Sequence, residues 1–152
     1  MGVSLDQIKQ LREKTSAGVA DCRKALEEAG GDFEKAEELL KSWGIDKAAS
    51  KADREAGQGL VETYIHSGGK VGAMVEVNCE TDFVARTDEF KTLAHEVAMQ
   101  VSAMDPKDVE ELLEQEYIRD SSKKIGDLVK EAIAKLGENI VIKRFMRFEL
   151  GQ

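Results

Sequence analysis

Aromatic residues make up only 5% of this 152-residue sequence, which contains two histidines and two cysteines. The cysteines, Cys22 and Cys79, do not have a metal-binding spacing, and a small secreted scaffold would contain more of them. A metal site generally needs three or four ligands, and no acidic or thiol residue stands at helical spacing from both histidines, His66 and His95. These absences argue against a disulfide scaffold and against a metal centre.

Excess positive charge and long apolar runs are lacking as well. The formal net charge of -8 argues against direct binding to nucleic acid or to an anionic membrane, because phosphate contacts need clustered lysine and arginine. The longest apolar runs are too short to span a bilayer. The N-terminus resembles neither a signal segment nor a transit peptide, and Asp6 breaks the myristoylation pattern that Gly2 begins. We therefore expect a soluble, reduced, cytoplasmic protein.

Catalytic signatures are also missing. Gly68-Gly69-Lys70 lacks the spacer and hydroxyl residue of a phosphate loop and joins two predicted strands, which favours a hairpin turn. No serine lies at a nucleophile elbow, and the acidic residues are scattered as on solvated helix faces. Cys79 precedes a turn, but it has no histidine near it in sequence, and a small buried strand-end residue explains it better. We expect no catalytic residue, cofactor or metal.

The first 45 residues predict a three-helix module. Ser4 and Gln7 form a capping-box pattern, Gly30-Gly31 ends a second helix, and Asp32 begins a third that is predicted to end at Gly44. Residues 46–59 are small and charged with no apolar face, which predicts a solvated connector.

Residues 60–152 predict an α+β domain. The segments 60–66 and 70–77 flank a Ser-Gly-Gly turn and predict a β-hairpin. Helices are predicted after Thr87, from Asp105-Pro106 and over 125–136, followed by a strand over 140–150. This composition predicts a three-stranded antiparallel sheet covered by helices. Because so narrow a sheet has edges to protect, we also expect self-association.

Residues 78–86, Asn-Cys-Glu-Thr-Asp-Phe-Val-Ala-Arg, connect the second strand to the helix after Thr87. Phe83 lies outside the apolar periodicity of that helix. A large apolar side chain at such a connection either packs in the core as a hydrophobic staple or contacts a partner. Staples are common, so the residues alone favour packing.

This nonapeptide, with the preceding Gly72–Val77, resembles the signature of the bacterial translation elongation factor Ts family. Four other segments resemble further parts of that family: Leu11–Gly18, Asp21–Leu26, Lys135–Ile140 and Arg144-Phe145. Together the matches cover nearly the whole chain.

The resemblance implies a guanine-nucleotide exchange factor for elongation factor Tu, which is a binding protein rather than an enzyme. It also implies that the N-terminal helices resemble a ubiquitin-associated domain. In this family the Asp-Phe of the motif contacts the G domain of elongation factor Tu and disturbs its Mg²⁺ and phosphate site. In this chain the motif is Thr81, Asp82, Phe83 and Val84. The resemblance implies that Phe83 inserts beside Asp82, and that Thr81 and Arg86 hold the turn.

Leu11, Val19 and Ala20 are implied as a second docking surface. Many family members carry bulky residues, often methionine, where this chain has Val19 and Ala20, which implies weaker or reshaped docking. Longer members contain a duplicated core and a helical hairpin, so the single core unit of this chain implies a homodimer. Two other interpretations stay open: a ubiquitin-associated-like adaptor whose second domain oligomerises, and a small thiol enzyme centred on Cys79.

Overall fold

The N-terminal part of the protein is a bundle of three helices. The computed structural model describes residues 2–15 and 17–152, so Ser16, within the Leu11–Gly18 segment, lies outside the described residues. The bundle contains α1 (Leu5–Thr15), α2 (Val19–Glu28) and α3 (Phe33–Lys51). Its predicted caps are present: the Gln7 amide donates to Ser4 Oγ at 3.2 Å, and the Lys35 amide donates to Asp32 Oδ1 at 3.1 Å.

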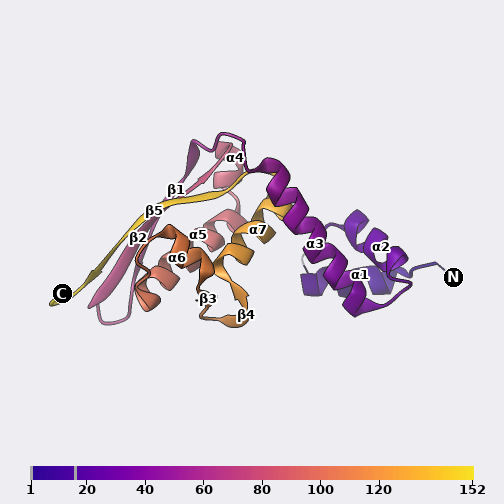
Figure 1. Cartoon of the computed structure of the whole chain (residues 1–152), viewed down its shortest axis with the longest axis horizontal. Helices are drawn as coiled ribbons and strands as arrows, with labels where there is room; N and C mark the ends of the chain where they lie inside the picture. The colour runs from indigo at the N-terminus through magenta and orange to yellow at the C-terminus, as the bar shows by residue number, and fades with distance from the viewer. Residues whose placement is uncertain (1, 16) are drawn as a thin grey trace.

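Helix α3 is longer than predicted and connects the bundle to the rest of the molecule (Figure 1). The prediction that it ends at Gly44 was wrong, because the helix continues to Lys51 and packs against α7 (Ile125–Leu136). A Cβ on Gly44 would lie 3.5 Å from Ala134 Cβ, and Ala48 is buried in the main core. Small residues on α3 therefore let the two helices approach closely, although they give it no apolar stripe. The division into 1–45, 46–59 and 60–152 stays a prediction.

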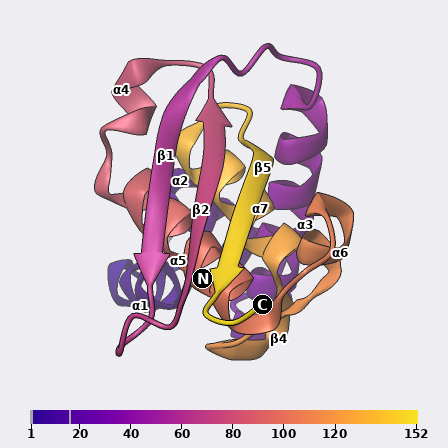
Figure 2. The same cartoon turned by 90° about the vertical axis from the view of Figure 1, so that its left-hand side faces the viewer.

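The predicted three-stranded antiparallel sheet is confirmed. It contains β1 (Gln58–Ile65), β2 (Val71–Cys79) and β5 (Val141–Glu149) in the order β1-β2-β5. Helices α5 (Asp88–Met104), α6 (Val109–Glu114) and α7 lie behind this sheet in Figure 2. Alternate residues of β2 point into the core between the sheet and these helices, so that Val75, Val77 and Cys79 are fully buried. The fold is α+β, as predicted.

Two features between α5 and α7 differ from the prediction. The helix expected at Asp105-Pro106 begins instead at Val109, because Asp105 ends α5 in the left-handed conformation (φ 45°) and Asp108 caps α6 by accepting the Glu111 amide at 2.8 Å. A short hairpin, β3 (Glu116–Tyr117) and β4 (Asp120–Lys124), was not predicted. Its polar sequence has no alternating apolar residues, and the buried side chain of Gln100 holds it through hydrogen bonds to residues 116 and 118.

Within the described residues, none of the helices is both long and apolar enough to cross a membrane.

Gly59 allows β1 to begin close to β2, and we expect Gly59→Ala to destabilise the fold. Its φ is +145°, and an added Cβ would lie 2.0 Å from the Val77 carbonyl oxygen. We expect a loss of about 1–3 kcal/mol in the free energy of unfolding, the usual cost of such backbone strain. Urea denaturation measures this loss. Gly57→Ala is the matched control, because its Cβ would meet nothing within 4 Å; equal effects of the two variants would contradict this explanation.

Candidate functional site at the end of strand β2

The predicted site residues Thr81, Asp82, Phe83, Val84 and Arg86 lie together on a single helical turn, α4 (Asp82–Ala85), and its two caps. Thr81 begins the turn, and its hydroxyl oxygen accepts the Val84 amide at 3.4 Å. The Arg86 guanidinium pairs with the Asp82 carboxylate one turn earlier. The site is therefore a compact corner between β2 and α5.

The two faces of this turn differ in burial. Ala85 is 1% exposed, and Val84 packs against the core. Phe83, by contrast, is 83% exposed, the largest exposed fraction among the large apolar residues that the structure describes. The hydrophobic-staple interpretation of Phe83 is therefore wrong. Its ring is available to a partner at the outer corner of the molecule.

Glu138, which sequence reasoning did not select, holds the start of the turn. It follows Gly137, the left-handed cap that ends α7. Its Oε1 accepts the amides of Glu80 at 3.1 Å and Thr81 at 2.9 Å, and its Oε2 accepts the Thr81 hydroxyl at 2.7 Å. The local sequence shows only a polar pair, Glu138-Asn139, just after a helix end. Nothing local indicates that Glu138 contacts a turn 57 residues earlier.

Glu80 and Asn139 form a second set of contacts beside the first. The Glu80 carboxylate accepts the Asn139 backbone amide at 3.0 Å and lies 3.6 Å from the Arg54 guanidinium. The buried Asn139 side chain donates to the backbone oxygens of Ala52 at 3.4 Å and Arg54 at 2.8 Å. The end of α3, the β2–α4 turn and the α7–β5 junction thus meet in one polar network.

Cys79 is a structural residue of the same corner. Its side chain is fully buried, and its thiol donates to the Thr81 carbonyl oxygen at 3.1 Å. Burial raises the pKa of the Cys79 thiol above its usual value, and the nearby Glu138 carboxylate raises it further. A thiol that resists ionisation is a poor nucleophile, so this environment argues against a thiol enzyme.

The predicted N-terminal docking residues do not form one surface. Val19 is 49% exposed and Ala20 is also exposed, both on the first turn of α2. Leu11 is fully buried against residues of the bundle core. Its role as a docking contact is therefore contradicted, and it stabilises the bundle from inside instead.

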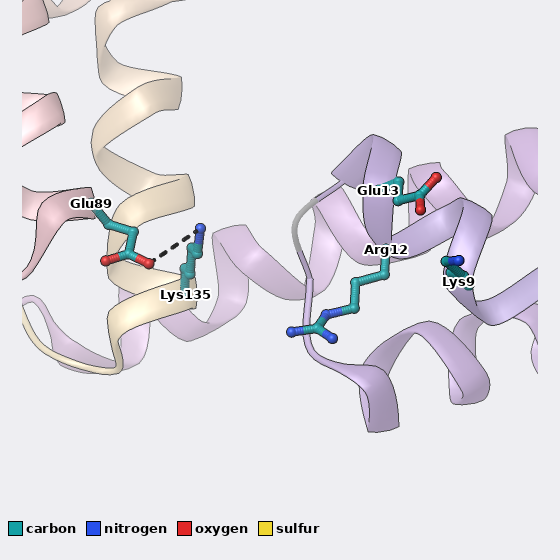
Figure 3. A pocket seen from close by; sticks show the side chains of 5 residues that line it. All are labelled: Lys9, Arg12, Glu13, Glu89 and Lys135. Atoms are coloured by element: carbon teal, nitrogen blue, oxygen red, sulfur yellow. Dashed lines mark ion pairs between the residues drawn. The ribbon is translucent and has the colours of Figure 1, made fainter.

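One hollow, of about 440 Å³, lies between the bundle and the core, and its lining is charged: Lys9, Arg12, Glu13, Glu89 and Lys135. In Figure 3, Arg12 extends from α1 into the gap and Lys135 approaches Glu89, 3.9 Å away. A small-molecule site is typically concave and mostly apolar, so this charged surface does not indicate one. Over residues 2–15 and 17–152, no cluster of three or more His, Cys, Asp and Glu is placed to bind a metal.

Comparison with known proteins identifies the family. The family model for elongation factor TS matches residues 80–152. Elongation factor Ts of Thermoanaerobacter sp. (strain X514) is 47% identical over 195 aligned residues, which cover 99% of this chain and 96% of that protein. The Coprothermobacter proteolyticus protein is 46% identical over the full length of both chains, and the chloroplastic elongation factor Ts of Guillardia theta is 45% identical over 99% and 90% of the two. Each alignment is longer than the 152 residues of this chain, so these relatives contain segments that it lacks. The chain belongs to the elongation factor Ts family of translation elongation factors.

Proposed function

We propose that this protein is a guanine-nucleotide exchange factor for elongation factor Tu. It acts by binding in the cytoplasm, where translation elongation takes place, and it uses no cofactor and performs no covalent chemistry. The observation that carries this proposal is the exposed ring of Phe83, held on a turn that is fixed to the core on its other face. Burying a phenylalanine contributes about 1.5–3 kcal/mol, and a partner that covered this ring would gain that free energy.

The proposed mechanism follows from the way a GTPase holds its nucleotide. Backbone amides surround the phosphates and Mg²⁺ is bound to their oxygens. A side chain that enters this region from outside displaces those groups, which weakens nucleotide binding. Coupling between two ligands is reciprocal, so a factor that lowers the affinity for GDP must itself bind the nucleotide-free protein more tightly. In this proposal Phe83 provides the coupling, with Asp82 as its polar neighbour.

The N-terminal bundle supplies a second contact in this proposal. The exposed first turn of α2, with Val19 and Ala20, offers a small apolar surface, while α3 joins the bundle to the core through α7. Two contacts on one partner raise the effective concentration of each. The bundle therefore increases affinity, and the turn at Phe83 provides the effect on the nucleotide.

Release of a fluorescent GDP analogue from elongation factor Tu tests the function directly. We expect the protein to accelerate release in a concentration-dependent and saturable manner. Unchanged release at micromolar protein, with complex formation absent by gel filtration, would contradict the proposal and favour the adaptor interpretation.

We also propose that the protein is a homodimer joined through the outer face of its sheet. Helices cover one face, and no described element covers the other in Figure 2. Met74 of β2 lies opposite Met146 of β5. Gly72 of β2 lies between Phe148 of β5 and Ile65 of β1. The side chains of Ile65, Met74, Met146 and Phe148 are between 43% and 70% exposed. They form a contiguous apolar surface of a kind that marks protein interfaces.

The charge distribution favours a second copy as the occupant of this surface. Most of the molecule is acidic, with a net charge of -8, which disfavours contact between copies elsewhere. On the sheet face, Glu76 is neutralised within the chain by Arg144 at 2.9 Å. An isologous contact needs only one self-complementary surface, and this face is apolar and locally neutral.

Phe148→Lys is expected to convert the dimer into a monomer. A lysine in each of two facing sheets would be buried without a partner, and removing each unpaired charge from water opposes the free energy gained by burying this apolar face. Analytical ultracentrifugation at micromolar concentration measures the change in mass. Leu5→Lys, at a residue 77% exposed on α1, adds the same charge outside the sheet and leaves the dimer intact. A monomeric unmutated protein would contradict the proposal.

A further inference from the structure

The proposed inserting residue lies on an element that is too short to hold its own position. Helix α4 contains four residues, Asp82–Ala85, and one helical turn is not stable in isolation because its nucleation is unfavourable. The direction of Phe83 therefore depends on the packing of Val84 and Ala85 against the core and on what fixes the start of the turn. That start is residues 80–81, whose amides both donate to Glu138.

Glu138 supplies more than one contact at this point. A single carboxylate accepts two adjacent backbone amides and the Thr81 hydroxyl, and Thr81 in turn accepts the Val84 amide. Charge-assisted hydrogen bonds of this kind are stronger than neutral ones. Glu138 thus fixes the residue that caps α4, and the cap fixes the orientation of the turn.

The contacts of Glu138 are separate from those that stabilise the main core. Its neighbours Ile140 and Ile142 hold β5 in the sheet by burial, with at most 4% of each side chain exposed. Glu138 itself is half-buried at the edge of this core. If it is removed, water can satisfy the amides of residues 80–81, so the fold persists while the turn loses its fixed direction.

We propose that Glu138 is a positioning residue for Phe83, which it orders before the partner binds. The inference rests on the proposed function, because it concerns how that function is carried out. An ordered side chain loses less conformational freedom on binding. Pre-organisation therefore increases the affinity for the partner and the rate of nucleotide release without adding a contact. Glu138 touches neither nucleotide nor partner in this scheme and acts only through the turn.

The variants Glu138→Ala and Glu138→Gln separate positioning from general stability. Alanine removes all three hydrogen bonds, and we expect the acceleration of GDP release to fall about tenfold, in the range that lost pre-organisation of an interface produces. Glutamine can accept both amides with its oxygen and donate to the Thr81 hydroxyl with its nitrogen, so we expect it to restore most of the activity. Glu131→Ala, on α7 in an exposed pair with Lys123, is the matched control and leaves activity unchanged.

Combination with Phe83→Ala provides the decisive measurement. If Glu138 acts through Phe83, then Glu138→Ala has no further effect on exchange once Phe83 is alanine. An equal loss in both backgrounds would show an independent role and overturn the inference. Failure of glutamine to restore activity while alanine and glutamine variants melt at the same temperature would also overturn it.

Thiol labelling of Cys79 tests the turn without any exchange assay. The buried thiol contacts the Thr81 carbonyl, so a mobile turn exposes it. We expect Glu138→Ala to increase the labelling rate of the Cys79 peptide at least severalfold and to leave that of Cys22, in the N-terminal bundle, unchanged. An unchanged rate at Cys79 would overturn the inference even if exchange is normal. An increased rate with no exchange activity in the unmutated protein would instead contradict the proposed function alone.

Discussion

Phe83→Ala is expected to reduce the acceleration of GDP release from elongation factor Tu by about tenfold to a hundredfold. The estimate follows from the burial of one phenylalanine in the partner, about 1.5–3 kcal/mol, since each 1.4 kcal/mol changes an equilibrium constant about tenfold. The ring is 83% exposed, so its loss leaves no cavity in the free protein. Stopped-flow release of a fluorescent GDP analogue measures the loss, and thermal unfolding should be unchanged.

Two further substitutions sharpen this result. Phe83→Leu keeps an apolar side chain of smaller area, so we expect an intermediate rate. Ile118→Ala removes another exposed apolar side chain, 43% exposed on the β3–β4 hairpin, and should leave exchange unaffected. If Phe83→Ala accelerated GDP release as well as the unmutated protein while its fold stayed intact, the turn would not be the site of action.

The contrast between Phe83 and Glu138 shows how far sequence reasoning reaches at this site. Phe83 is noticeable in the sequence because it lies outside the apolar periodicity of the helix that follows, and periodicity is a local property. Its exposure was not predictable, because a staple and a partner contact have the same sequence. Glu138 has no local signal, since its partners lie 57 and 58 residues away. A contact of that kind is determined by how β2 and β5 pair, which only the tertiary structure specifies.

The fold, like the site, could be predicted only where the sequence signals are short-range. The antiparallel sheet and most helices follow from alternation, periodicity and capping residues, which are short-range. The extension of α3 past Gly44 does not, because its buried contacts come from small residues that match α7 in shape rather than in hydrophobicity. Docking residue Leu11 was misplaced for a related reason: a leucine on an amphipathic helix can belong to the core or to a surface, and in this bundle it belongs to the core.

The burial of Leu11 leads to the largest expected effect on stability. Leu11→Ala leaves a cavity in a small bundle, whose buried apolar side chains over the described residues are Ile8, Leu11, Cys22, Ala25, Leu26 and Ala36. Such truncations cost about 2–5 kcal/mol, which is comparable to the whole stability of a module of this size, about 3–5 kcal/mol. We expect the bundle to unfold while the sheet and its helices stay folded. Circular dichroism with temperature would then show less helix at the outset and an unchanged transition of the core.

The same variant separates affinity from the effect on the nucleotide. If the bundle serves as the second contact, its unfolding raises the protein concentration needed for half-maximal exchange, whereas the maximal rate persists because Phe83 and its supporting network are intact. Leu5→Ala is the matched control, since it makes the same substitution on α1 at a residue that is 77% exposed. An unchanged half-maximal concentration with an unfolded bundle would exclude docking by Val19 and Ala20. A parallel fall in the maximal rate would instead indicate that α3, through its contact with α7 and the carbonyl groups held by Asn139, transmits the state of the bundle to the Phe83 turn.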